Sequence, residues 1–121
     1  MQLSAVRGAK SGDKYVISFF FAAMFYIYIL YSESAYRYYI GHTNDPERRL
    51  TEHNTTEDIK FTTKFRPWNL LLSFEVSNVR GEAIKMERFI KKQKSRIFIR
   101  KLIESKDDQS YLMDLKKKAV G

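Results

Sequence analysis

The chain has no cysteine among its 121 residues, and this absence limits most strongly how it can fold. Without cysteine it can form neither a disulfide framework nor a thiolate zinc site, and it has no Cys nucleophile. An apolar core must therefore hold the fold together, and 121 residues suffice for one small domain. Zinc-finger proteins, dithiol redox proteins and enzymes with a separate cofactor-binding domain are excluded, and we expect no small-molecule cofactor.

The charge of the chain points to a polyanionic partner. The formal net charge is +8 at pH 7, which favours a nucleic acid or an anionic membrane surface. Ten Lys or Arg and three Glu lie between residues 80 and 106, so this segment carries most of the excess charge. Two basic helices there would present a positive face that binds phosphates and releases counterions. The alternative is a solvated amphipathic surface without a partner.

An apolar run occupies residues 15–31 and is interrupted only by Ser18. Because basic residues precede it, the run could be a short signal anchor. Its second half, residues 25–31, consists of aromatic and aliphatic residues typical of a strand. We therefore expect residues 1–23 to be an extension outside a domain at 24–106, followed by a C-terminal tail at 107–121. We also expect no membrane attachment and a cytoplasmic location.

The order of patterns along the chain predicts the fold class. We expect strands at 25–31 and 37–41, a helix at about 45–54, a strand at 69–76, and helices at 78–93 and from residue 95. In the third strand, Leu70, Leu72, Phe74 and Val76 alternate, which predicts one buried side. This ββαβαα order has too few crossovers for a parallel doubly wound sheet. It predicts an α/β (α+β) fold with a small three-stranded, mostly antiparallel sheet flanked by helices.

Two sets of polar residues stand out by position. Glu87 lies at the rim of an apolar helical stripe among Lys and Arg, so it is either an ion-pair partner or a divalent metal ligand. Position alone favours the ion pair. Arg49 and His53 are four residues apart and share one helix face. They could bind a phosphate and relay a proton, or form an exposed face without a role.

The combination of these residues resembles the GIY-YIG nuclease family. Tyr26-Ile27-Tyr28 corresponds to the first motif, and Tyr39-Ile40-Gly41 corresponds to the second. Arg49, His53 and Glu87 follow in the family's order. The resemblance covers about residues 24–105 and is strongest to the small single-domain bacterial members described as excinuclease C subunit-like. In two places the chain departs from the family pattern: Tyr26 replaces the first Gly, and Arg96-Ile97-Phe98-Ile99 offers no match to the family's later asparagine.

The resemblance implies a metal-dependent endonuclease that hydrolyses DNA phosphodiester bonds with little sequence specificity, in a setting such as DNA repair or recombination. The alternative is a nucleic-acid binding module that keeps the fold without turnover. Glu87 would then hold a single Mg²⁺ or Mn²⁺, Arg49 would clamp the scissile phosphate, and Tyr39 would orient the reacting groups.

Tyr28 would act as the general base or its relay, and because a free phenol has a pKa near 10 it needs a neighbouring proton acceptor or positive charge to work at neutral pH. The resemblance offers His42 for this role, while His53 occupies the position where members have His or Tyr. Trp68 is expected to belong to the core. The side chains expected to contact DNA are Lys64, Arg66, Lys91, Lys92, Lys94 and Arg96.

Overall fold

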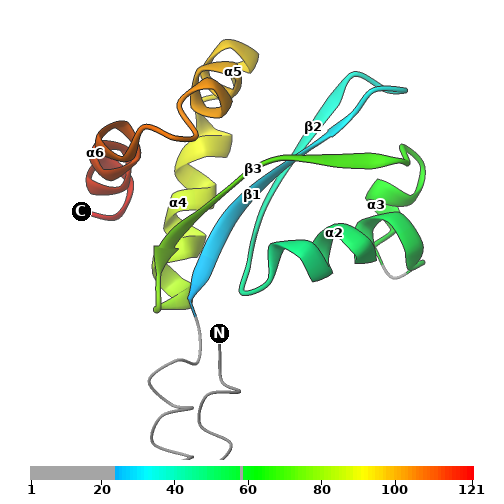
Figure 1. Cartoon of the computed structure of the whole chain (residues 1–121), viewed down its shortest axis with the longest axis horizontal. Helices are drawn as coiled ribbons and strands as arrows, with labels where there is room; N and C mark the ends of the chain where they lie inside the picture. Colours follow the sequence, from blue (N-terminus) through cyan, green and yellow to red (C-terminus); the bar gives the residue numbers. More distant parts are fainter. Residues whose placement is uncertain (1–23, 58) are drawn as a thin grey trace, which may run out of the picture.

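The computed structural model describes residues 24–57 and 59–121, which form a three-stranded sheet and its helices (Figure 1). The elements in chain order are β1 (Phe25–Ser32), β2 (Arg37–Thr43), α2 (Pro46–Thr55), α3 (Lys60–Thr63), β3 (Trp68–Ser77), α4 (Arg80–Lys92), α5 (Arg96–Glu104) and α6 (Gln109–Val120). The predicted α/β class with a three-stranded antiparallel sheet is confirmed. The expected extension at 1–23 lies outside the described residues.

The strand order is β2-β1-β3, so β1 is the central strand and pairs antiparallel with both neighbours. Side chains alternate between the two faces of a strand. Ile27 and Ile29 therefore enter one face, and Tyr28 and Leu30 enter the other, and all four are buried. Burial on both faces explains why residues 25–31 read as a continuous apolar run.

Helices cover both faces of the sheet, as Figure 1 shows, with α4 to α6 on one side and α2 and α3 on the other. The face towards α4 contains the larger core, in which Ile27 and Ile29 pack with Met86 and Ile90. The second face has a smaller cluster of Tyr28, Leu30, Trp68 and their neighbours, and Trp68 is buried there as expected. Tyr28, the tyrosine of the first motif, thus lies in the smaller cluster.

The expectation that β3 has a single apolar side is wrong for Leu70. Leu72 pairs with Ile29, but Leu70 pairs with Leu30, because an irregularity in the β1–β3 pairing leaves Leu71 unmatched. An extra residue in one strand reverses the faces of the residues beyond it. Leu70 accordingly packs against the Tyr28 cluster, whereas Leu72 belongs to the core under α4.

The segment expected to be a C-terminal tail contains helix α6. Asp108 caps this helix by accepting a hydrogen bond from the backbone N–H of Tyr111 at 3.0 Å. Leu112 and Leu115 are buried in the larger core, and α6 packs on α4 (Figure 1). The apolar residues recur at helical spacing, and the mixed charges between them obscured that pattern.

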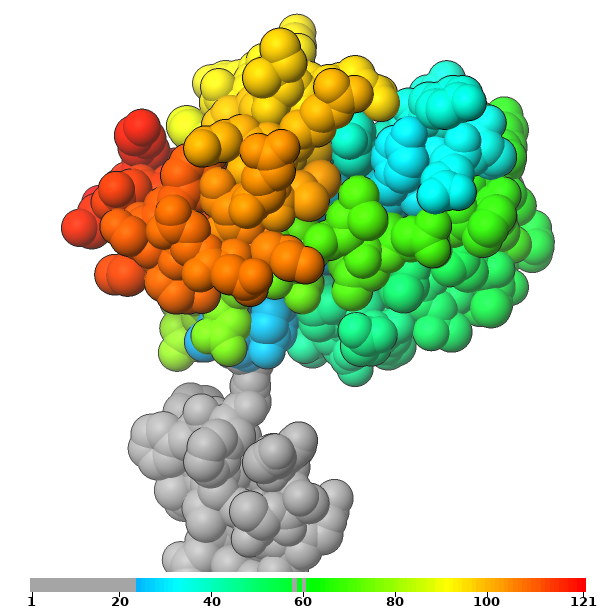
Figure 2. Space-filling view, turned by 45° about the horizontal axis from the view of Figure 1, so that its top comes forward, coloured from blue at the N-terminus to red at the C-terminus, as the bar shows by residue number. Residues whose placement is uncertain are grey.

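The hairpin turn of β1 and β2 is joined to the start of α5. Arg96 donates from Nη1 to the carbonyl oxygen of Tyr36 at 2.9 Å, and its guanidinium lies over the ring of Tyr38. Figure 2 shows the hairpin (cyan) beside the yellow and orange segments of α4 and α5. In the described part of the chain, no helix has the length and apolar character needed to cross a membrane. Residues 25–31 of the possible anchor form β1, and residues 15–23 lie outside the described ranges.

Candidate active site

A buried hydrogen-bonded chain connects the central strand to α2 and α3. The Tyr28 hydroxyl lies 2.9 Å from Nε2 of His53, and Nδ1 of His53 lies 2.9 Å from Oγ1 of Thr62. Tyr28 is 1% exposed, and His53 and Thr62 are fully buried. The sequence offered no signal for Thr62, since nothing in its spacing distinguishes it from neighbouring threonines.

Gly41 provides the space that the Tyr28 ring occupies. The two residues pair across β1 and β2, and a Cβ at position 41 would lie 2.5 Å from the Tyr28 hydroxyl oxygen and 2.7 Å from Cζ. Real Cβ atoms essentially never make contacts this short, so a larger residue would displace the ring or the strand. The glycine of the second motif thus has a steric role: it lets Tyr28 lie over the neighbouring strand and reach α2.

Tyr39 packs beside the hydrogen-bonded pair. Its ring centroid is 4.6 Å from that of His53 and 6.2 Å from that of Tyr28. Trp68 lies edge-on to Tyr39 with centroids 6.2 Å apart. Tyr39 is half-buried, so it packs against both rings from the side that is nearer to solvent.

Arg49 lies one helical turn before His53 on α2. The helix begins as expected: Asp45 caps it by accepting from the backbone N–H of Arg48 at 3.1 Å, and Pro46 occupies the first turn. Arg49 donates from Nη1 to Glu52 at 2.8 Å and also interacts with the Tyr28 hydroxyl. The predicted shared face of Arg49 and His53 therefore points to Tyr28.

The environment keeps both members of the Tyr28–His53 pair neutral at physiological pH. Burial raises the pKa of the Tyr28 hydroxyl above its usual value of 10.0, against the lowering effect of Arg49. Burial lowers the pKa of His53 from 6.5 to about 4, and the positive charges of Arg49 and Arg66 contribute to this shift. A neutral phenol next to a neutral imidazole can move a proton along the pair without first forming a phenolate.

Glu87 lies on α4 in a cluster of opposite charges. Its Oε1 is 2.6 Å from Nδ1 of His42, and its Oε2 is 2.6 Å from Nζ of Lys91. His42 Nε2 in turn lies 3.3 Å from Nη1 of Arg80. Glu87 thus forms the ion pair that its position suggested, while its role as a metal ligand stays a prediction. Its negative charge contributes to the raised pKa of Tyr28.

The histidine that contacts the Tyr28 hydroxyl is His53, whereas His42 was expected there. His42 is on β2 next to Gly41, so the alternation of the strand places it on the α4 face, where it contacts Glu87. His53 Nε2 contacts the Tyr28 hydroxyl instead. His53, and not His42, is therefore the hydrogen-bond partner of Tyr28, and a role of His42 in catalysis stays a prediction.

The expected DNA-contacting side chains divide into two groups. Arg66 is tied to the backbone: it donates from Nε to the carbonyl oxygen of His53 at 2.7 Å and from Nη2 to that of Thr56. Lys91 pairs with Glu87, and Arg96 bonds the hairpin turn. The remaining three are exposed: Lys64, Lys92 and Lys94.

A cationic cavity of about 290 Å³ lies near the hairpin. Tyr38, Ser95 and Ile99 line it together with the aromatic and basic side chains of Phe61, Arg37, Lys94 and Arg96. The Phe61 ring is 6.3 Å from that of Tyr39, so this cavity adjoins the site. Arg37 and Phe61 were missed by sequence reasoning because their proximity depends on the fold of the hairpin against α3.

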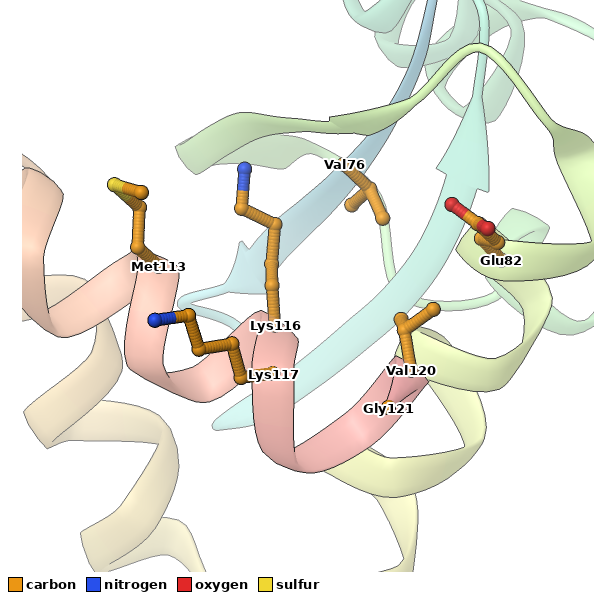
Figure 3. A pocket seen from close by; sticks show the side chains of 7 residues that line it. All are labelled: Val76, Glu82, Met113, Lys116, Lys117, Val120 and Gly121. Carbon is orange, nitrogen blue, oxygen red and sulfur yellow. The ribbon is translucent and has the colours of Figure 1, made fainter.

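A second surface groove, of about 300 Å³, is lined by different elements. Figure 3 shows its lining: Val76, Glu82, Met113, Lys116, Lys117, Val120 and Gly121, from β3, α4 and the end of the chain. It contains none of the residues around Tyr28. Glu82 is the one acidic side chain among these lining residues.

The site around Tyr28 can support acid–base chemistry on a phosphate. The imidazole of His53 can accept a proton, the guanidinium of Arg49 lies beside it, and the carboxylate of Glu87 is nearby. Comparison with known proteins agrees with that class. The family model described as the GIY-YIG catalytic domain matches residues 24–102, so the chain belongs to the GIY-YIG family, whose members are of the nuclease type.

The chain is also similar to a curated bacterial protein. It is 41% identical over 69 residues to the "UPF0213 protein" of Enterococcus faecalis (strain ATCC 700802 / V583), a match that covers 55% of this chain and 76% of that protein. No solved structure matches significantly.

Proposed function

We propose that this protein is a metal-dependent endonuclease that hydrolyses DNA phosphodiester bonds with little sequence specificity, in the setting of DNA repair or recombination. Membership of a nuclease-type family supports this proposal. The observation that carries it is the buried hydrogen bond of 2.9 Å between the Tyr28 hydroxyl and Nε2 of His53. That bond gives the phenol a destination for its proton.

The Tyr28–His53 pair would activate the attacking water. Hydrolysis needs a water that loses a proton as it attacks phosphorus. The Tyr28 oxygen would accept that proton while its own hydrogen moves to Nε2 of His53. An arriving phosphate brings negative charge, which raises the pKa of His53 from about 4 and makes it a better acceptor. The relay would thus become active only with substrate in place.

Arg49 would hold the scissile phosphate beside this relay. Its guanidinium already interacts with the Tyr28 hydroxyl, and guanidinium groups bind phosphate oxygens in a bidentate manner. Glu52 keeps the side chain in position through the hydrogen bond at 2.8 Å. The attacking water and the phosphate would therefore meet next to Tyr28.

Glu87 would be the protein ligand of the metal. Among the residues that the structure describes, no group of three or more His, Cys, Asp or Glu could hold an ion. Mg²⁺ sites in phosphoryl-transfer proteins commonly take one or two carboxylates and fill the rest with water and phosphate oxygens. Glu87 would supply such a carboxylate, with the ion taking the place of Lys91 or His42 at one of its oxygens. When bound, a Mg²⁺ or Mn²⁺ would supply charge stabilisation at the leaving oxygen.

The basic segment of α4 and α5 would provide DNA affinity. Exposed side chains such as Lys92 and Lys94 can neutralise backbone phosphates. Contacts to phosphates position a protein on DNA but carry no sequence information. We therefore expect weak, salt-dependent binding with a Kd of roughly 10⁻⁴ to 10⁻⁶ M at physiological salt.

Conversion of supercoiled plasmid to nicked or linear DNA tests the proposal. Purified protein should cut with Mg²⁺ or Mn²⁺, and EDTA should abolish the cut. Glu87→Ala should not cut but should still bind DNA, whereas Glu104→Ala, at an exposed position on α5, should cut like the unaltered protein. Cutting that persists in EDTA or in Glu87→Ala would contradict the proposed metal site.

A non-catalytic nucleic-acid binding module is the second candidate. One observation favours it: both oxygens of Glu87 are already engaged by His42 and Lys91. This candidate predicts salt-dependent DNA binding and no cutting under any metal condition. The plasmid assay combined with a binding measurement separates the two.

A further inference from the structure

Thr62 is fully buried against His53, and neither the motifs nor the proposed mechanism uses it. Its Oγ1 lies 2.9 Å from Nδ1 of His53 and donates to the carbonyl oxygen of Ile59 at 3.1 Å. The hydroxyl therefore lies between the imidazole and the backbone. The contacts of Thr62 Oγ1 with His53 and with Ile59 influence which ring nitrogen of His53 carries the hydrogen.

A count of hydrogens favours one tautomer of His53. A threonine hydroxyl has one hydrogen, and a neutral imidazole has one N–H and one bare nitrogen. With the Thr62 hydrogen on the Ile59 carbonyl at 3.1 Å, Nδ1 of His53 supplies the hydrogen between the imidazole and Thr62. Nε2 is then bare and accepts from the Tyr28 hydroxyl.

The opposite tautomer leaves a buried hydrogen without an acceptor. If Nε2 carried the hydrogen and donated it to Tyr28, the phenol hydrogen would need another acceptor. Among the described residues, the groups that interact with that hydroxyl are His53 and Arg49, and a guanidinium has no acceptor. An unsatisfied buried polar hydrogen is costly, so the Nδ1–H tautomer is the stable one.

We propose that Thr62 is a positioning residue of the nuclease site, which holds His53 with its hydrogen on Nδ1 so that Nε2 can take the proton of Tyr28. The inference rests on the proposed function for its catalytic consequence. In the proton step, the water O–H bond breaks and a new O–H bond forms at Tyr28. The Tyr28 hydrogen passes to Nε2, and Nδ1 keeps its hydrogen. His53 becomes an imidazolium whose Nδ1–H still donates to Thr62.

The surroundings hold Thr62 in register with His53. The backbone carbonyl of Thr62 accepts from Nε1 of Trp68 at 2.8 Å. Asn54, next to His53 on α2, bonds the backbone N–H of Trp68 at 2.7 Å and its carbonyl at 3.0 Å. Arg66 donates to the carbonyl oxygen of His53. Hydrogen bonds thus connect residues 62–68 to the end of α2 on both sides of the His53 imidazole. They support a fixed orientation of the Thr62 hydroxyl towards His53.

Nitrogen NMR of the full chain labelled in its histidines tests the tautomer directly. The chain has only two histidines, so His42→Asn assigns the spectrum. A bare ring nitrogen and an N–H nitrogen resonate far apart, and we expect His53 to show N–H at Nδ1 and a bare Nε2. Thr62→Val removes the partner of the Nδ1 hydrogen and should raise the population of the form with the hydrogen on Nε2, whereas Thr62→Ser should keep it on Nδ1. A hydrogen on Nε2 in the unaltered protein would overturn the proposal.

The matched control is Thr63→Val, because Thr63 Oγ1 donates to the same Ile59 carbonyl at 3.0 Å but does not contact His53. Thr62→Val should lower the cleavage rate about 10²- to 10⁴-fold, the usual contribution of a general base. Thr62→Ser and Thr63→Val should cut like the unaltered protein. Equal rates for Thr62→Val and the unaltered protein would also overturn the proposal. If the unaltered protein does not cut, the nuclease proposal fails, and the NMR result still decides the role of Thr62 in setting the tautomer.

Discussion

Substitution of Gly41 by alanine perturbs the site at a single atom. The added Cβ would lie 2.5 Å from the Tyr28 hydroxyl oxygen, 2.7 Å from Cζ and 2.9 Å from Cε2. These atoms belong to a ring that is 1% exposed, so it cannot swing into solvent without opening the cluster. The ring or the β1–β2 pairing must therefore move by about 1 Å to reach ordinary van der Waals contact.

The cost of this movement has two parts. Overpacking of a filled core costs about 1–3 kcal/mol. Moving the hydroxyl away from Nε2 of His53 leaves a buried donor and acceptor unpaired, which costs about 1–3 kcal/mol more. We expect Gly41→Ala to lower the free energy of unfolding by about 3 kcal/mol, a large share of the 5–15 kcal/mol typical of a domain. Loss of the Tyr28–His53 bond should also abolish any cleavage.

Urea unfolding followed by tryptophan fluorescence measures this change, because the chain has one tryptophan and Trp68 is buried in the same cluster as Tyr28. Gly81→Ala is the control: nothing lies within 4 Å of a Cβ at this position in the first turn of α4. Replacing glycine by alanine in a helix should stabilise the protein by up to about 1 kcal/mol. If Gly41→Ala unfolds at the same urea concentration as the unaltered protein, the steric argument for the motif glycine is refuted.

Two further predictions follow from the surroundings of His53. The pKa of His53 is about 4 in the folded protein and 6.5 ordinarily, so the unfolded chain binds more protons between these pH values. The free energy of unfolding should therefore fall by about 3 kcal/mol as the pH drops from 6.5 to 4. His53→Gln should flatten this part of a plot of urea midpoint against pH. The charged and titratable groups facing His53 are Tyr28, Tyr39, Arg49, Glu52 and Arg66. Arg66→Ala should destabilise the fold by about 2 kcal/mol through loss of its bonds to backbone carbonyls, whereas the exposed Lys64→Ala should change stability by less than about 0.5 kcal/mol; equal urea midpoints for the two variants would contradict this role.

The sequence predicted those elements whose signals are local. The aromatic strand at residues 25–31 and the start of the helix expected at about residue 45 were found because alternation and helix-start signals depend on near neighbours. The bulge that turns Leu70 to the other face was missed because periodicity assumes an unbroken register. Helix α6 was missed because charges break up the apolar spacing around Leu112.

The site was predictable as a set of residues but not as a set of contacts. The motif spacing identified Tyr28, yet the choice between the two histidines depends on which face of the sheet each one enters. His42 alternates to the α4 face, while α2 carries His53 to the phenol. Likewise, a basic residue in the sequence does not reveal whether it meets phosphate or a backbone carbonyl, and Arg66 does the latter.

Cleavage of end-labelled DNA by Tyr28→Phe in the presence of Mg²⁺ tests most directly the central claim, that the Tyr28–His53 pair activates the attacking water. The substitution removes the single hydroxyl oxygen and keeps the ring that packs in the core. We predict that Tyr28→Phe binds DNA as the unaltered protein does and that its cleavage rate falls about 10²-fold or more. Cleavage by Tyr28→Phe at the rate of the unaltered protein would contradict the account, because the proton of the water would then leave by a route that does not involve Tyr28.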